Sequence, residues 1–218
     1  MDLKKVLADI DNVKAKGNLD VNIESIESDS RKVREGCMFV AIKGFETDGH
    51  NYVNKAIEMG AKVVMVQADS NLKQFILNSN VTLVVVPDTR LALAIASCNF
   101  YGNPSRRFKL IGITGTKGKT TTSYMLKAIL EKQNHKVGLV GTIANYIGEK
   151  KLGDSERTTP ESTELQKMFA QMVEEGVDTV IMEVSSQSIK LNRIAGCDFD
   201  IGVFTNFSKD HISEKEHP

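Results

Sequence analysis

The sequence predicts an α/β protein in which a small N-terminal α/β domain precedes a doubly wound, mostly parallel second domain. Short apolar runs that resemble strands alternate along the chain with amphipathic segments of helical length. Several of these runs are almost wholly apolar, which is typical of parallel strands buried on both faces of a sheet. A cluster of turn-forming residues, Gly102-Asn103-Pro104-Ser105, separates two such series and predicts a domain boundary.

The first domain is expected over residues 1–104. Residues 10–30 are polar, and the strand-like and helical patterns begin after them. The expected strands are 37–42, 62–66 and 81–86, and the expected helices are 52–59 and a longer one that begins after Asp88 and ends at Gly102. In the longer helix, the residues expected to share one face are Leu91, Ala94, Ile95 and Cys98.

The second domain is expected over residues 105–218. Its predicted strands are 109–114, 136–140, 179–182 and 200–204, and its predicted helices are 120–132 and one that Pro160 opens. In the second helix a single apolar stripe is formed by Leu165, Met168, Phe169, Met172 and Val173. The residues between 140 and 160 are expected to form a polar connection. The last two strands are expected to be covered on both faces, as in a doubly wound sheet.

Composition excludes several classes of protein. The chain has 28 Lys and Arg residues against 28 Asp and Glu residues, so its zero formal charge gives no broad electrostatic surface for nucleic acid or for an anionic membrane. No apolar run approaches the roughly 18 to 20 residues of a membrane span, and the N-terminus leads into no secretory apolar segment. Cys37, Cys98 and Cys197 are odd in number and widely spaced, which argues against a disulfide framework. These features predict a soluble protein of the reducing cytoplasm with neither nucleic-acid nor membrane partners.

A glycine-rich segment with the chemistry of a phosphate loop joins the expected strand 109–114 to the expected helix 120–132. It has the form G-x-x-G-x-x-G-K-T and begins at Gly112. In such a loop, glycines let backbone N–H groups turn toward a polyphosphate, and the helix N-terminus adds its dipole. Lys119 is expected to reach the β- and γ-phosphates, and the Thr120 hydroxyl can bind Mg²⁺. The sequence therefore predicts an ATP site here.

An acidic partner for the metal is expected at the carboxyl end of a neighbouring strand, because ligands of open α/β sheets lie outside those ends. Glu183 directly follows the apolar run 179–182 and meets this expectation. Another strand ends near Phe204, and Asp210 and His211 follow it. A histidine at such a place is, taken alone, more often a surface or capping residue than a ligand.

At this point several ordered motifs resemble those of the Mur ligases, most closely the branch that adds the third residue of the peptidoglycan stem peptide. In the second domain they are Thr114-Gly115-Thr116-x-Gly118-Lys119-Thr120, Thr158-Thr159-Pro160, Met182-Glu183-Val184-Ser185-Ser186, Arg193 and Phe204-Thr205-Asn206-x-Ser208-x-Asp210-His211. In the first domain Asp29-Ser30-Arg31-Lys32-Val33, Phe39-Val40-Ala41, Gly44 and Asp48-Gly49-His50 resemble the UDP-binding domain of that branch.

The resemblance implies an ATP-dependent ligase of peptidoglycan synthesis. ATP would phosphorylate the D-glutamyl carboxylate of UDP-N-acetylmuramoyl-L-alanyl-D-glutamate, and the amino group of meso-diaminopimelate or L-lysine would attack the acyl phosphate. The resemblance does not say which of the two amino acids is added. It also implies a third domain and a carbamoylated lysine beyond Pro218, so the chain looks like a fragment with an incomplete central sheet, and full turnover is not expected of it.

The resemblance implies a role for each matching residue. Catalytic roles would fall to Lys119, Glu183 and His211, and metal binding to Thr120, Glu183 and His211. ATP binding would fall to Gly115, Thr116, Lys117, Gly118, Lys119, Thr120 and Thr121. The muramoyl dipeptide would be bound by Thr158, Thr159, Ser185 and Arg193, and the uridine diphosphate by Ser30, Phe45, Glu46 and Thr47.

The sequence departs from the usual family pattern at Lys117, Arg157 and Gln187, where Asn, Asn and His are usual, and after His211. Lys117 could add a cation to the phosphate site or point to solvent. Two alternatives to this ligase stay open. One is a sister amide ligase such as a folylpolyglutamate synthase, although such enzymes lack the UDP-binding domain that Ser30 and its neighbours indicate. The other is a catalytically silent module that binds ATP or UDP-muramoyl peptide.

Overall fold

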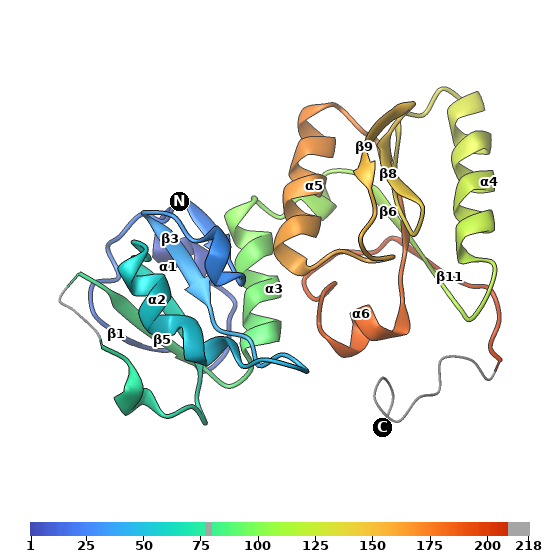
Figure 1. Ribbon diagram of the computed structural model, residues 1–218. Coiled ribbons are helices and arrows are strands. Elements are labelled where there is room, and N and C mark those ends of the chain that lie inside the picture. The colour runs from blue at the N-terminus through green and yellow to red at the C-terminus, as the bar shows by residue number, and fades with distance from the viewer. Residues whose placement is uncertain (77–79, 209–218) are drawn as a thin grey trace. The chain divides into compact units, whose positions relative to one another are not determined.

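The computed structural model describes residues 1–76 and 80–208. The chain divides into two compact units, Met1–Phe100 and Tyr101–Pro218. Each unit contains one sheet with helices on both faces, so the predicted α/β fold class is confirmed (Figure 1). Within the described ranges, none of the helices has the length and apolar character that crossing a membrane requires.

The first unit contains a five-stranded sheet in the order β1-β5-β4-β3-β2. Its strands are β1 (Lys14–Lys16), β2 (Ser25–Glu27), β3 (Cys37–Val40), β4 (Val63–Gln67) and β5 (Thr82–Val86), and its α-helices are α1 (Leu3–Val6), α2 (Val53–Glu58) and α3 (Thr89–Phe100). Strands β2 to β5 run parallel, and β1 pairs antiparallel with β5. Short 3₁₀ turns are η1 (Ser30–Lys32), η2 (Gly49–Tyr52) and η3 (Leu72–Gln74).

Residues of β3 alternate between two hydrophobic cores in this unit. Met38 and Val40 pack with α1 and α3, whereas Cys37 and Phe39 pack with α2 on the opposite face. All four residues of β3 are buried, as expected for a parallel strand with helices on both sides.

The second unit contains a six-stranded sheet in the order β11-β6-β10-β7-β8-β9. Its strands are β6 (Lys109–Thr114), β7 (Val137–Val140), β8 (Ala144–Ile147), β9 (Lys150–Asp154), β10 (Thr179–Glu183) and β11 (Ile201–Phe204), and its helices are η4 (Pro104–Arg106), α4 (Lys119–Lys132), α5 (Ser162–Glu174) and α6 (Ser186–Lys190). Strands β11, β6, β10 and β7 run parallel, and β8 and β9 continue the sheet antiparallel.

Helices α4 and α5 cover opposite faces of this sheet (Figure 1). The apolar stripe predicted for α5 is confirmed, since Leu165, Phe169 and Met172 are fully buried and Met168 and Val173 pack beside them. Burying each such side chain contributes about 1.5 to 3 kcal/mol before ordering costs. The sheet thereby holds the carboxyl ends of β6 and β10 rigidly side by side.

The structure corrects several expectations about the elements. The expected polar connection after β7 contains the hairpin β8–β9, which turns at Gly148 and Glu149. Strand β11 is not covered on both faces: it pairs with β6 at the sheet edge of the described residues, and Ile201 and Phe204 are exposed. Helix α5 begins after Glu161 and not at Pro160, because Glu161 has extended backbone dihedrals.

In the first unit one expectation is confirmed, and two others differ from the structure. Asp88 caps α3 as predicted, accepting hydrogen bonds from the backbone N–H groups of Arg90 and Leu91. The Leu91 side chain itself is exposed, however, and Leu93 packs into the core in its place. The polar segment before Ser30 also holds the short strands β1 and β2, which are too brief and too polar to give a strong pattern.

Candidate functional site

The glycine-rich segment forms a turn between the carboxyl end of β6 and the start of α4. Gly115 has φ +134° and Gly118 has φ +84°, backbone conformations that residues with a Cβ rarely adopt. Lys119 folds over the turn, and its Nζ donates to the carbonyl oxygens of Gly115 at 2.7 Å and Thr116 at 3.3 Å. The first turn of α4 carries backbone N–H groups without intrahelical partners, which is the arrangement that binds phosphate.

This turn is held in place by the segment after β11. Asn206 accepts from the Thr116 N–H through its carbonyl oxygen and from the Lys117 N–H through Oδ1, each at 3.0 Å. The Thr205 hydroxyl donates to the Lys117 carbonyl oxygen at 2.7 Å. At Gly115 a Cβ would lie 2.2 Å from the Thr205 hydroxyl oxygen. Only glycine therefore allows this close packing, and the turn is preorganised by a distant part of the chain.

Glu183 ends β10 beside this turn and is fully buried. Its Oε2 accepts from the Thr120 hydroxyl at 2.8 Å and from the Thr142 hydroxyl at 3.1 Å, and its Oε1 accepts from the Thr142 N–H at 3.1 Å. A Cβ at Gly141 would lie 2.3 Å from Oε1, so the absence of a side chain there admits the carboxylate. Gly141, Thr142 and Thr120 thus form a cradle around Glu183, which we call the carboxylate cradle.

The carboxylate cradle is chemically suited to a hard cation. A buried carboxylate is costly unless donors or a cation satisfy it, and here hydroxyl and amide donors do so. Carboxylate and hydroxyl oxygens are ligands that Mg²⁺ accepts, usually together with water and substrate phosphates. Burial raises the pKa of Tyr124, and the neighbouring Tyr146 and Glu183 raise it further, so this phenol stays neutral beside the site. Within residues 1–76 and 80–208, no group of three or more His, Cys, Asp and Glu side chains could hold a metal by itself.

Thr158, Thr159, Ser185 and Arg193 lie in one hydrogen-bonded group close to Glu183. The Thr159 hydroxyl donates to the Glu183 carbonyl oxygen at 2.9 Å and accepts from the Ser185 N–H at 3.2 Å. The buried Arg193 guanidinium donates to the Thr159 carbonyl oxygen at 3.3 Å, and the Thr158 hydroxyl oxygen lies 3.1 Å from that of Thr142. The four residues predicted to bind peptide thus lie at the carboxyl end of β10.

Arg193 is held by a residue that the sequence did not single out. Its guanidinium forms an ion pair with Glu161 at 2.9 Å, and the side chains are 8% and 29% exposed respectively. Because Glu161 also stands at the N-terminus of α5, it fixes Arg193 to the start of that helix.

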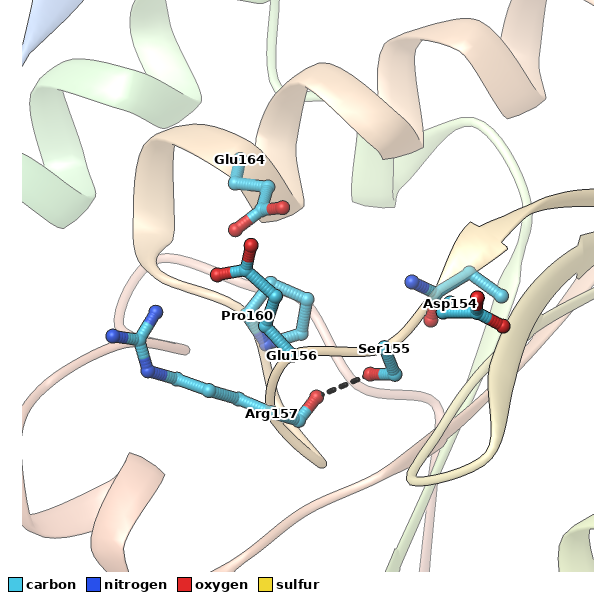
Figure 2. Close-up of a pocket in the computed structure, with 7 residues that line it drawn as sticks. Asp154, Ser155, Glu156, Arg157, Pro160 and Glu164 are labelled. Carbon is cyan, nitrogen blue, oxygen red and sulfur yellow. Dashed lines mark hydrogen bonds between the residues drawn. The ribbon is translucent and has the colours of Figure 1, made fainter.

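The segment that leads from β9 to Thr158 forms a tight turn, in which the Ser155 hydroxyl donates to the Arg157 carbonyl oxygen (Figure 2). A hollow beside it, lined in part by Glu156, Pro160 and Glu164, has a volume of about 10 Å³. That is room for roughly one water molecule, so this hollow is not the nucleotide site.

In the first unit the residues predicted to contact uridine diphosphate follow two neighbouring parallel strands. Ser30 comes after β2 and is buried, whereas Phe45, Glu46 and Thr47 follow β3 on an exposed loop. That loop is closed by the Gly44 N–H, which donates to the Thr47 carbonyl oxygen at 2.9 Å. Phe45 is 70% exposed at its tip.

The electrostatics beside Ser30 come from an ion pair between its two neighbours. The Arg31 guanidinium donates to both carboxylate oxygens of Asp29, and this hydrogen bonding lowers the pKa of Asp29 to about 2. Asp29 also accepts from the Arg31 N–H, which caps the turn that holds Ser30.

The structure does not bring the side chains of all predicted site residues into contact with the rest of the site. Lys117 is exposed, with its backbone but not its side chain engaged by the segment after β11. His211 lies outside the described residues. The sequence reading missed the roles of Gly141, Thr142 and Glu161 because the Glu183 and Arg193 side chains that they contact are 32 to 42 residues away; the adjacent Gly141-Thr142 pair at a strand end was the available signal.

Comparisons with known proteins identify the family to which the chain is related. The sequence matches the family described as Mur ligase family, catalytic domain, over residues 22–101, and Mur ligase middle domain over residues 113–217. It is 56% identical over 190 residues to the UDP-N-acetylmuramoyl-L-alanyl-D-glutamate--2,6-diaminopimelate ligase of Clostridium botulinum, covering 87% of this chain and 39% of that protein. The corresponding protein of Clostridium perfringens is 48% identical over 212 residues, with 97% and 43% covered. The chain spans about two fifths of the length of these curated relatives.

Solved structures share the fold. A structure titled as a UDP-N-acetylmuramoyl-L-alanyl-D-glutamate--2,6-diaminopimelate ligase aligns with a TM-score of 0.78 at 24% identity, covering 98% of this chain and 42% of that one. The MurF ligase of Thermotoga maritima in complex with ADP aligns with a TM-score of 0.55 at 21% identity, covering 84% and 37%. Two Mur ligase domains match in order along the sequence, and the curated relatives are 48% to 56% identical to it. The chain therefore belongs to the Mur ligase family.

Proposed function

We propose that this chain provides the substrate- and nucleotide-binding part of an ATP-dependent ligase that acts on UDP-N-acetylmuramoyl-L-alanyl-D-glutamate in peptidoglycan synthesis. The observation that carries the proposal is the juxtaposition of the phosphate-binding turn at Lys119 with the buried carboxylate of Glu183. Such a combination of a helix N-terminus, a lysine, a hydroxyl and a carboxylate is suited to a nucleoside triphosphate and its metal ion.

The ATP site would be formed by the turn after β6. The residues proposed to bind ATP are Gly115, Thr116, Lys117, Gly118, Lys119, Thr120 and Thr121. Lys119 already donates to carbonyl oxygens of the turn, so it can exchange these weak partners for phosphate oxygens without a large movement of the backbone. The MurF ligase of Thermotoga maritima, which shares this fold, is titled as a complex with ADP, and this supports the use of an adenine nucleotide.

Thr120 and Glu183 are proposed to hold Mg²⁺, together with His211 from beyond the described residues. The fit is supported by the carboxylate cradle, in which Thr120 and Glu183 already present their oxygens to each other at 2.8 Å. When bound, Mg²⁺ supplies neutralisation of the charge on the transferred phosphoryl group. Thr142 would keep the carboxylate oriented through its N–H and hydroxyl groups.

The peptide end of the substrate would be bound by Thr158, Thr159, Ser185 and Arg193, and the uridine diphosphate by Ser30, Phe45, Glu46 and Thr47. Arg193 carries the fixed positive charge that attracts the D-glutamyl carboxylate. Its location beside the end of β10 supports attack of that carboxylate on the γ-phosphate, which gives an acyl phosphate and ADP. An amine then attacks the acyl carbon and releases phosphate.

The amino acid proposed to be added is 2,6-diaminopimelate, because the relatives from Clostridium botulinum and Clostridium perfringens are named for it. L-Lysine is the alternative that the sequence left open. We place the reaction in the cytoplasm, which agrees with three widely spaced cysteines that no disulfide joins.

Two measurements test this proposal. Calorimetry on the 218-residue chain is expected to show binding of UDP-N-acetylmuramoyl-L-alanyl-D-glutamate and of Mg²⁺ with a non-hydrolysable ATP analogue. The natural polypeptide that contains residues 1–218 is expected to form tripeptide product with diaminopimelate in preference to L-lysine, as followed by mass spectrometry. Binding without any product would favour a silent binding module, and absence of binding to both ligands would refute the proposal.

A further inference from the structure

Thr142 has no role in the sequence reading, yet it touches both halves of the proposed site. Its N–H and hydroxyl groups both donate to Glu183, and its hydroxyl oxygen lies 3.1 Å from that of Thr158. Thr142 is itself exposed, so it lies over the buried carboxylate at the surface of the unit. Glu183 belongs to the nucleotide side of the site and Thr158 to the peptide side.

The direction of the hydrogen bonds follows from the chemistry of the groups. A carboxylate only accepts, so the single hydroxyl proton of Thr142 is used toward Glu183. The Thr142 oxygen is then free to accept the proton of the Thr158 hydroxyl. On the other side, the Thr120 hydroxyl also donates to the carboxylate, at 2.8 Å. These groups form one continuous chain, which we call the threonine relay: Thr158, Thr142, Glu183 and Thr120.

We propose that Thr142 is a positioning residue that couples peptide-substrate binding to nucleotide binding through the threonine relay. This inference rests on the proposed function. A ligand that engages the Thr158 hydroxyl changes the hydrogen bond that Thr142 receives, and Thr142 in turn orients the carboxylate that faces the metal. Hydrogen bonds in such chains polarise one another, so a change at one end alters the other. Each ligand is therefore expected to favour binding of the other, because coupling between sites is reciprocal.

Gly141 strengthens this inference because it lets the Glu183 carboxylate pack directly against the backbone and so restricts the movement of the relay. A side chain at this position would meet Glu183 Oε1 at 2.3 Å, so the carboxylate lies directly against the backbone that carries Thr142. The Gly141 N–H donates to the buried Asn145 side chain at 3.3 Å, which anchors the turn to β8. The Thr142 backbone is consequently fixed, and its hydroxyl is the part of the relay that can respond to a ligand.

The test is a thermodynamic cycle on the 218-residue chain. The Kd of Mg²⁺ with a non-hydrolysable ATP analogue is measured by calorimetry with and without saturating UDP-N-acetylmuramoyl-L-alanyl-D-glutamate. Thr142→Val keeps the side-chain shape but removes the hydroxyl, and Thr142→Ser keeps the hydroxyl. In the parent and in Thr142→Ser the dipeptide is expected to tighten nucleotide binding roughly 5-fold or more, a typical allosteric coupling. In Thr142→Val the ratio of the two Kd values is expected to fall to about 1.

The outcomes separate this inference from the proposed function. An equal coupling ratio in the parent and Thr142→Val, or a ratio near 1 in the parent with both ligands bound, overturns the role of Thr142 while leaving the proposed function intact. A parent chain that binds neither ligand refutes the proposed function itself. Circular dichroism and thermal unfolding of Thr142→Val establish that the variant is folded, and should it fail to fold, Thr158→Val breaks the relay at its other bond and is expected to lose the same coupling.

Discussion

The hydroxyl oxygen of Thr120 lies 2.8 Å from Oε2 of Glu183, although 63 residues separate the two in the sequence. The parallel pairing of β6 with β10 brings them together, because it places Glu183 opposite Ile113 just before the glycine-rich turn. Burial then leaves the carboxylate dependent on its hydroxyl and amide donors. The carboxyl ends of two paired strands, β6 and β10, therefore set the geometry of the proposed metal site.

Replacing Glu183 by Gln is expected to weaken the Mg²⁺ dependence of nucleotide binding and to destabilise the fold. The amide would turn an N–H₂ group toward the donors of Thr120 or Thr142, and an unsatisfied buried group costs about 1 to 3 kcal/mol. Magnesium titrations of nucleotide binding and urea unfolding measure the two effects. Magnesium curves that overlay those of the parent would show that this carboxylate does not serve the metal.

Replacing Gly115 by Ala is expected to displace the glycine-rich turn between β6 and α4. The new Cβ would lie 2.2 Å from the Thr205 hydroxyl oxygen, so the turn must separate from the segment after β11. Gly148→Ala is the matched control, because Gly148 also has a positive φ, of +55°, but a Cβ there would meet nothing within 4 Å. Thermal unfolding should show a larger loss for Gly115→Ala than the roughly 1 kcal/mol expected of the control. Equal losses would mean that Thr205 does not constrain the turn.

Glu161→Gln is expected to destabilise the second unit through Arg193. Removing the partner of a buried charge costs about 3 to 5 kcal/mol, and the partial exposure of Glu161 reduces this to about 1 to 3 kcal/mol. Asp154→Asn, which removes the partner of Lys151 in an exposed pair, is the control and should cause no measurable change. Urea unfolding compares the two variants. A Glu161→Gln variant as stable as the parent would leave Arg193 held by its other contacts alone.

The ion pair between Asp29 and Arg31 predicts a pH-dependent contribution to stability. Its hydrogen bonding lowers the pKa of Asp29 to about 2, below the roughly 3.9 of an unfolded chain. The stabilisation is therefore fully present above about pH 4 and is lost as the pH falls toward 2. Because the Arg31 side chain is 83% exposed, the ion pair contributes at most about 1 kcal/mol to the free energy of unfolding. Asp29→Asn should be less stable than the parent at pH 7, and the difference should shrink below pH 3.5. A difference that is constant with pH would contradict the assignment.

The main elements of the second unit could be predicted because their signals are local. The apolar run before Glu183 and the Gly-Lys-Thr pattern at Lys119 each determine one strand end or helix start within a few residues. The hairpin β8–β9 was not predicted, because β9 is largely polar and β8 has only four residues, and such short strands give weak alternation. Its only local signal was the two-residue turn at Gly148 and Glu149.

The candidate site could be predicted only in part, for a related physical reason. The residues proposed to meet the ligand directly, such as Lys119 and Glu183, carry recognisable chemistry. Residues that position them, such as Thr142 and Asn206, act through contacts made by folding, at 41 residues from Glu183 and 89 from Lys117 respectively. The edge position of β11 likewise depends on which strands pair with it, which an apolar run does not specify.

The most direct test of the account is the affinity of Lys119→Ala for Mg²⁺ with a non-hydrolysable ATP analogue, measured by calorimetry on the 218-residue chain. Lys119 lies partly exposed over the glycine-rich turn, so removal of its side chain should leave the fold intact, as circular dichroism can verify. The expected loss is about 1.5 to 3 kcal/mol, or roughly 10- to 150-fold in Kd. Lys132→Ala, at the other end of α4, should bind like the parent. An unchanged Kd for a correctly folded Lys119→Ala variant would contradict the assignment of this turn as the nucleotide site.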